Sequence, residues 1–178
     1  MRDIKKNIKD AAYRLLSAKD GYKVTTEDII KKAGIAKASF YVYYRDKYQL
    51  MSDMFLEQLN DIYVFTSPID FSSMADRYEI IINNYFDFIR NVVLSDKYNY
   101  VMIDITNFIE KRVSDLVIDN KGDMNDPIIK HAVHRMCLSS VLLLYETASN
   151  KISVKEFSNY VREWPYHLPK CIADYFNL

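Results

Sequence analysis

The sequence predicts an all-α protein with an N-terminal domain at residues 1–60 and a larger helical domain at residues 61–178. Glycine and proline are scarce, at 3 and 4 of 178 residues, whereas all-β folds need many turns. Apolar residues recur three and four positions apart along most of the chain, which is the spacing of one face of an α-helix. Hydrophobic residues make up 49% of the chain, which is enough to form a buried core.

The first two helices are predicted from an apolar stripe and from local capping signals. The stripe places the first helix at about residues 3–18. The second begins at Thr25, whose hydroxyl can cap the helix together with Asp28 three positions later. It ends at Gly34, where the following turn requires a positive φ angle.

The third helix, at residues 37–44, has two contrasting faces. At 100° per residue, Phe40 and Tyr44 share the face that packs inward, whereas Ala38 and Val42 lie on the opposite face. An outer face of small side chains can approach another surface closely. Such a helix suits the major groove of DNA, where apolar side chains can contact only features such as thymine methyl groups.

A fourth helix begins after Asp46 and continues to about residue 62, so that it connects the two domains. Lys47 occupies its first position, where a cation opposes the helix dipole. A DNA phosphate bound at this terminus would explain the lysine. A side chain that simply points into solvent is the alternative.

Charge is distributed unevenly, although the whole chain is neutral. Residues 1–51 contain 12 Lys and Arg against 6 Asp and Glu, whereas residues 52–178 contain 12 against 18. A basic end on an acidic body predicts that the first part approaches a polyanion, with a solvated basic surface as the alternative. No apolar run suits a membrane span or a secretory signal, so we expect a cytoplasmic protein.

Residues 34–47, GIAKASFYVYYRDK, resemble the helix-turn-helix signature of TetR/AcrR-family transcriptional regulators, which is roughly G-V-S-K-G-T-L-Y-H-Y-F-x-x-K. The resemblance extends over about residues 4–60. Ala36 replaces the usual Ser, which removes a side-chain cap, and Val42 replaces a common His, which removes a polar contact. The resemblance implies that eight residues contact DNA: Thr26, Lys37, Ala38, Ser39, Tyr41, Val42, Tyr43 and Lys47.

The second domain is predicted to consist of long helices. Apolar spacing places them at about residues 71–94, 98–118 and 128–149, with a last helical segment at 153–176. Pro127 suits the start of the third of these. Pro165 and Pro169 are expected to kink or break the last segment.

The resemblance implies a homodimer in which residues 128–149 and 153–176 pair with those of a second copy as a four-helix bundle. The apolar character of residues 136–145 on nearly all sides fits this, because such a helix must be covered. A two-fold dimer also suits a palindromic DNA operator, because two copies of the recognition helix read two half-sites.

No motif indicates catalysis, and we expect no enzyme activity, no cofactor and no metal. The sequence lacks a nucleophile motif, a phosphate-binding glycine loop and an HExxH pattern. His131, His134 and Cys137 follow one another every three residues, but they spread around a helix too widely for an easy metal site. We expect both Cys137 and Cys171 to be buried thiols.

A small-molecule pocket in the second domain is implied by the resemblance and is compatible with the composition of its helices. Aromatic and methionine side chains suit apolar or aromatic ligands, although an ordinary aromatic core has the same composition. The candidate ligand-binding residues are Tyr78, Tyr85, Phe88, Met102, Phe108, Met136 and Tyr145.

The favoured hypothesis is a dimeric repressor that binds a palindromic operator and is released by a small-molecule ligand. A constitutive or architectural DNA-binding protein without a ligand is the second hypothesis, and a solidly packed second domain would favour it. A helical interaction protein or enzyme is the third. The small outer face of residues 37–44 and Lys47 argue against it, because they serve no core.

Overall fold

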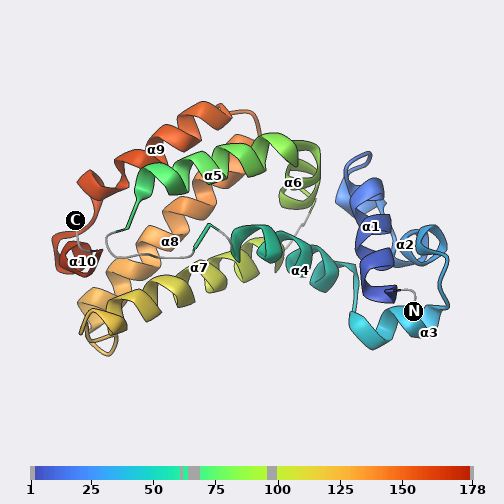
Figure 1. Cartoon of the computed structure of the whole chain (residues 1–178), viewed down its shortest axis with the longest axis horizontal. Coiled ribbons are helices and arrows are strands. Elements are labelled where there is room, and N and C mark those ends of the chain that lie inside the picture. Colours follow the sequence, from blue (N-terminus) through green and yellow to red (C-terminus); the bar gives the residue numbers. More distant parts are fainter. Residues whose placement is uncertain (1–2, 61, 64–68, 96–99, 177–178) are drawn as a thin grey trace.

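The computed structural model describes residues 3–60, 62–63, 69–95 and 100–176, which form helices and no strand (Figure 1). The prediction of an all-α fold is therefore confirmed. No helix in this part of the chain is long and apolar enough to cross a membrane. The α-helices are α1 (Ile4–Leu16), α2 (Thr26–Ala33), α3 (Lys37–Tyr43), α4 (Lys47–Asn60), α5 (Phe71–Asn84), α6 (Phe86–Val93), α7 (Tyr100–Asp119), α8 (Pro127–Ala148), α9 (Val154–His167) and α10 (Lys170–Ala173).

The predicted capping signals define the ends of α2 and α8. The Thr25 hydroxyl accepts a hydrogen bond from the Asp28 amide at 3.1 Å, and the Asp28 carboxylate accepts one from the Thr25 amide at 2.9 Å. Gly34 ends α2 with a φ angle of 64°. Pro127 lies in the first turn of α8, where its missing amide hydrogen removes no helical hydrogen bond.

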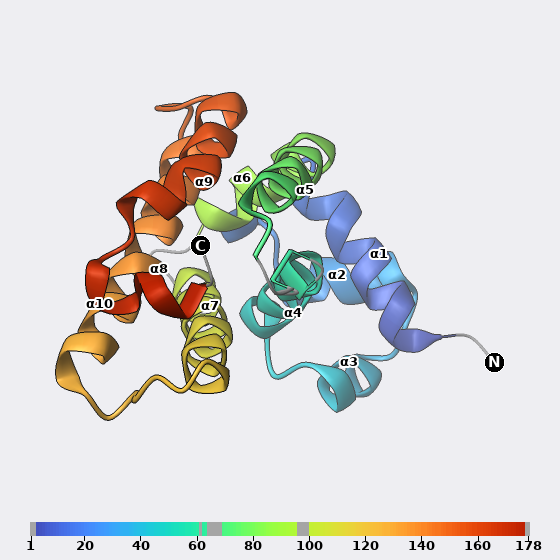
Figure 2. The same ribbon diagram turned by 60° about the vertical axis from the view of Figure 1, so that its left-hand side comes forward.

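Helices α1, α2 and α3 form a separate group at one end of the molecule, and α4 leads from it toward the rest of the chain (Figure 1). Figure 2 shows α4 between this group and α7. The Ser52 hydroxyl on α4 donates a hydrogen bond to the Asp104 carboxylate on α7 at 2.6 Å. A second connection joins α6 to α1, where the Asn91 amide donates to the Leu16 carbonyl at 2.7 Å. The N-terminal group is thus attached to the body through both α4 and α6.

The single helix expected at residues 71–94 is wrong, because the chain breaks at Tyr85 into α5 and α6. Tyr85 has φ and ψ angles of −122° and 22°, outside the helical range. The break turns α6 toward α1, so that Tyr85 and Phe88 each place a ring 5.7 Å from the ring of Tyr13. Packing between the two domains thus overrides the continuous apolar pattern along the chain.

The two C-terminal prolines have different effects. Pro165 lies inside α9, which continues to His167. Leu168 is extended, as expected of a residue that precedes proline, and Pro169 then separates α9 from α10. The last segment is therefore broken at Pro169 and not at Pro165.

The two cysteines have different environments. Cys137 is buried, and its burial raises the pKa of the thiol to about 12, so it stays protonated near neutral pH. Cys171 is exposed, so the expectation of a buried thiol is wrong at this position. It lies on the short helix α10 after the Pro169 break, where only Ile172 is buried.

Candidate DNA-binding surface

Helix α3 is held in place by its two aromatic anchors. Phe40 and Tyr44 are 0% and 3% exposed, which confirms that they face inward. Their rings lie 5.9 Å apart, and the Tyr44 hydroxyl donates a hydrogen bond to the Asp53 carboxylate on α4 at 2.8 Å. A seven-residue helix is unstable alone. The Lys5 ammonium of α1 also lies 5.9 Å from the centre of the Tyr44 ring, so these contacts fix the orientation of α3 on α1 and α4.

The opposite face of α3 is exposed, as its pattern predicts. Val42 is 77% exposed, the highest fraction among the large apolar residues of α3, and Ala38 is also exposed. Tyr41 and Tyr43 flank this face and are 48% and 41% exposed. Ser39 is only half-buried. The face therefore presents small side chains in its middle and phenol groups at its sides.

The start of α3 has no side-chain cap, as expected from alanine at position 36. The first residue, Lys37, forms an exposed ion pair with Glu27 on α2 at 3.1 Å. The hydrogen bond raises the pKa of the Lys37 ammonium and lowers the pKa of the Glu27 carboxyl. Lys37 is therefore already ion-paired in the DNA-free protein. Thr26, the first residue of α2, lies beside Glu27 in the sequence and is half-buried.

Lys47 begins α4 as predicted, but its ammonium group is directed into the protein. Its Nζ donates hydrogen bonds to the carbonyl oxygens of Val24 at 2.7 Å, Gly21 at 2.9 Å and Tyr22 at 3.4 Å. The Asp46 carboxylate caps the helix by accepting from the Gln49 amide at 2.8 Å. Lys47 thereby fastens the turn between α1 and α2 to α4, a role that its position in the sequence did not indicate.

The N-terminal helices match a known protein family in sequence as well as in arrangement. Residues 8–54, from α1 to the middle of α4, match the model described as "Bacterial regulatory proteins, tetR family". Residues 8–54 are a TetR-family DNA-binding domain. Its helix-turn-helix is formed by α2 and α3, and the chain is accordingly a DNA-binding regulator.

A solved structure supports the same fold over nearly the whole chain. The structure described as "Dihydroxyacetone kinase operon activator DhaS" superposes with a TM-score of 0.60 at 15% sequence identity. The match covers 92% of this chain and 94% of that chain. At this identity the likeness concerns the fold. No curated protein matches the sequence with comparable significance.

The ion pair between Glu27 and Lys37 leads to a prediction about DNA affinity. We expect Glu27→Gln to strengthen binding to all DNA sequences by about two- to fivefold, because it frees Lys37 and removes a negative charge near phosphates. Fluorescence anisotropy with unrelated duplexes at several salt concentrations measures this. Glu163→Gln, on the distant helix α9, is the charge-matched control. Equal or weaker binding by Glu27→Gln would contradict a phosphate role for Lys37.

A second network, which the sequence did not reveal, links α1, α3 and α4 of this TetR-family domain. Asp53 accepts from Tyr44 and pairs with Lys9 at 2.8 Å and Lys5 at 3.4 Å, and Lys9 also pairs with Glu57. Burial opposes ionisation of Asp53, but the hydrogen bonds from Lys9 and Tyr44 outweigh it and lower the pKa of the carboxyl. Two lysines of the basic N-terminal segment are therefore engaged within the protein.

The seven candidate ligand-binding residues of the body lie in different surroundings, although Tyr78 and Phe88 line one small void. Tyr78 and Phe108 both pack on the buried ring of Tyr63, at centroid distances of 6.1 and 6.0 Å. Tyr85 and Phe88 instead pack against α1, as described above. Met102 is buried, Met136 is half-buried, and Tyr145 is 37% exposed. The structure thus distributes these residues among the core, the α1–α6 contact and the surface.

Two buried phenols form the polar centre of the body. The Tyr78 hydroxyl donates to the Tyr63 hydroxyl at 2.6 Å, and burial raises the pKa of both groups. The void beside Tyr78, between α4, α5, α6 and α8, measures only about 10 Å³. This is no larger than the space for one water molecule. Among the described residues no three His, Cys, Asp or Glu side chains are grouped to hold a metal, and His134 instead contacts Glu110 at 2.9 Å.

Proposed function

We propose that this TetR-family regulator is a homodimer that binds a palindromic operator, represses transcription there and is released by a small molecule. The observation that carries the DNA-binding part is the outer face of α3, with Val42 exposed above the buried Phe40 and Tyr44. We assign residues 1–60 to DNA binding and residues 61–178 to dimerisation and regulation. The proposed DNA contacts are Thr26, Lys37, Ala38, Ser39, Tyr41, Val42 and Tyr43. Lys47 was expected among them, but because its ammonium group bonds carbonyls of the 21–24 turn we propose that it acts by holding this turn on α4.

The dimer is supported by an exposed apolar stripe on α8. Ile128, Leu138, Leu142 and Tyr145 are 68%, 47%, 57% and 37% exposed. Leu138, Leu142 and Tyr145 follow one another at the four- and three-residue spacing of a helix that packs on another helix. On α9, Tyr160 is also 46% exposed. Covering this stripe with the same stripe of a second copy gives a two-fold dimer, and two-fold symmetry requires a palindromic operator.

Repression is proposed because it requires only that the dimer occupy DNA, whereas activation requires an additional contact with the transcription machinery. The described structural neighbour DhaS is called an activator, so the sign of regulation needs its own test. Release by a ligand is supported by the double attachment of the N-terminal group through α4 and α6. A ligand that binds one arrangement of these helices better shifts the equilibrium toward it.

The small size of the void beside Tyr78 favours a second candidate function. A void of about 10 Å³ holds no organic ligand, whereas small-molecule sites usually measure hundreds of Å³. A constitutive DNA-binding regulator without an effector would be consistent with such a core.

Selection of DNA sites from a random duplex library tests the proposal. We expect the wild type to enrich a palindrome, and Val42→Ala to change the preference at one or two base pairs in each half-site. The reason is that the exposed valine can contact thymine methyl groups, each worth a fraction of the roughly 1–3 kcal/mol that separates bases. A reporter gene placed behind the selected site then distinguishes repression from activation.

The control for the selection is Ile80→Ala, on the body helix α5 and 59% exposed. It should return the wild-type preference. No enrichment of any sequence by the wild type would contradict a sequence-specific regulator. The same preference for wild type and Val42→Ala would remove Val42 from the reading face.

A further inference from the structure

An open groove lies between the DNA-binding helices and the body. It has a volume of about 560 Å³ and is lined by α1, α4 and the start of α6. We refer to it as the α1–α4–α6 groove. Its volume falls within the range of small-molecule sites, whereas the void beside Tyr78 in the body is about 10 Å³. The groove is therefore the better place for an effector than the predicted aromatic core.

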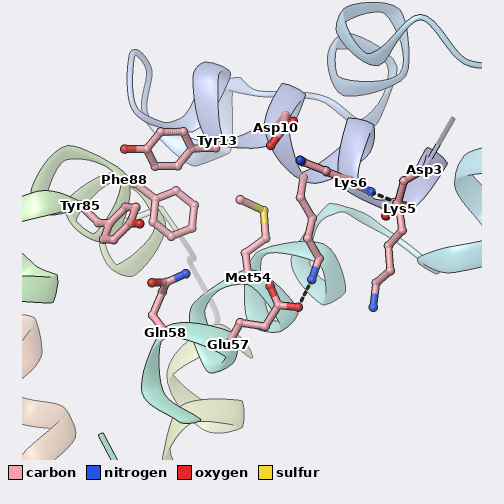
Figure 3. A pocket seen from close by; sticks show the side chains of 11 residues that line it. Asp3, Lys5, Lys6, Asp10, Tyr13, Met54, Glu57, Gln58, Tyr85 and Phe88 are labelled. Atoms are coloured by element: carbon pink, nitrogen blue, oxygen red, sulfur yellow. Dashed lines mark hydrogen bonds and ion pairs between the residues drawn. The ribbon is translucent and has the colours of Figure 1, made fainter. Parts of the chain in front are cut away.

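One end of the groove is aromatic. Figure 3 shows Tyr13 of α1 facing Tyr85 and Phe88, with Met54 and Gln58 of α4 nearby. Tyr13 and Tyr85 meet edge to face, and both are half-buried, so part of each ring remains available. A flat aromatic ring fits such a wall, because it can stack or meet these rings edge to face. Tyr85 and Phe88 were expected to line a ligand site inside the second domain. They instead line this groove together with residues of α1 and α4.

The other end of the groove is formed by charged residues of α1. Lys9 is paired with Asp53 and Glu57, and Lys5 is paired with Asp53. Lys6 also lines the groove, and its ammonium group has no acidic or hydrogen-bonding partner among the residues that the structure describes. Asp3 is already used as the cap of α1, because it accepts a hydrogen bond from the Lys6 amide at 3.1 Å.

Asp10 also lines the groove and opposes an anion there. Asp10 lies one helical turn after Lys6, in the direction of Tyr13. The carboxylate of a ligand is therefore best bound away from Asp10, toward the N-terminal end of α1. That end also carries the positive end of the helix dipole. The polar group that suits this arrangement is a single carboxylate placed at Lys6, with Lys5 next to it.

We propose that the α1–α4–α6 groove binds small aromatic monocarboxylates and that their binding lowers the affinity for DNA. The regulatory part of this inference rests on the proposed function. The ring lies against Tyr13, Tyr85 and Phe88, and the carboxylate pairs with Lys6. Such a ligand contacts both domains at once.

The position of the groove explains how binding would reach DNA. α1 forms one wall and belongs to the DNA-binding group, whereas α6 forms part of the other wall and belongs to the body. A ligand carboxylate also competes with Asp53 and Glu57 for Lys5 and Lys9, which join α1 to α4. A ligand that fits one width of the groove favours one spacing of the two α3 helices in the dimer. Couplings of this kind typically change affinity by about 5- to 150-fold.

Calorimetry on the DNA-free protein tests the binding part. The probes are benzoate, cinnamate and indole-3-acetate, each compared with its uncharged amide. We expect the carboxylates to bind at least about tenfold more tightly than the amides, because a charged hydrogen bond to Lys6 is added. Lys6→Ala should remove this difference, and Gln58→Trp should block both kinds of probe by filling the groove. Lys32→Ala, an exposed lysine on α2, is the matched control and should bind as the wild type does.

Anisotropy with a labelled operator, with and without the bound probe, then tests the coupling. We expect the tightest carboxylate to lower the DNA affinity of the wild type at least about fivefold and to leave Gln58→Trp unchanged. Absence of carboxylate binding, equal binding by Lys6→Ala, or an unchanged DNA affinity with the probe bound would each overturn the proposal. Loss of DNA binding without any probe would instead count against the proposed function, because the calorimetry contains no DNA.

Discussion

A Leu142→Glu variant is expected to be monomeric and to bind operator DNA at least about 100-fold more weakly than the wild type. Leu142 is 57% exposed in the middle of the α8 stripe, where a second copy would cover it. A buried, unpaired carboxylate at such an interface costs several kcal/mol. Separating the two recognition helices also removes the gain from simultaneous binding, which is typically 10²- to 10⁴-fold.

Sedimentation velocity and operator anisotropy measure the two effects. The wild type should sediment as twice the chain mass of 21.0 kDa, and the variant as a single chain. The variant should still fold, because substitutions at exposed sites usually change stability by less than about 0.5 kcal/mol. Ile80→Glu introduces the same charge on α5, at a residue that is 59% exposed, and should remain a dimer. A dimeric Leu142→Glu protein would place the interface elsewhere.

The features that the sequence predicted correctly depend on residues close to one another in the chain. Thr25 and Asp28 cap α2 through groups three positions apart, and Gly34 adopts the positive φ that its turn requires. The inward positions of Phe40 and Tyr44 follow from helical spacing alone. Each of these features needs only local backbone geometry, so a single sequence is enough to predict it.

The features that sequence reasoning missed are contacts between distant segments. Lys47 reaches carbonyl groups 23 to 26 positions earlier, and Lys9 pairs with Asp53 on another helix. The break at Tyr85 is also of this kind, because it allows aromatic packing against Tyr13. No periodicity or capping signal in a single chain encodes such pairs, since they depend on how the helices are placed.

These contacts change the meaning of the charge asymmetry. The first 51 residues carry an excess of six positive charges, but several of the cations already have partners within the protein. Lys37 is paired with Glu27, Lys9 is paired with Asp53 and Glu57, and Lys5 is paired with Asp53. Each pair must be broken or shared when a phosphate binds. The number of released counterions should therefore be smaller than the number of basic residues implies.

The distinction between a lysine that bonds within the protein and one that binds DNA phosphate matters most for Lys47. Lys47→Ala is expected to lower the free energy of unfolding by about 2 kcal/mol, because carbonyls of the 21–24 turn lose a charged donor. For a chain of this length the melting temperature should fall by about 4–8 °C. DNA binding should weaken as well, because the turn between α1 and α2 is no longer fastened to α4.

Thermal unfolding and the salt dependence of DNA affinity together separate this role from a phosphate contact. A lysine that binds only phosphate would reduce the salt slope by about one without changing the melting temperature. A lysine that fastens the turn lowers the melting temperature and leaves the slope of the folded variant nearly unchanged. Lys23→Ala is the control within the same turn, because Lys23 is exposed and its contacts are local, an ion pair with Asp20 and a cation–π contact with the neighbouring Tyr22 ring. It should shift the melting temperature by no more than about 1 °C, since exposed ion pairs contribute little.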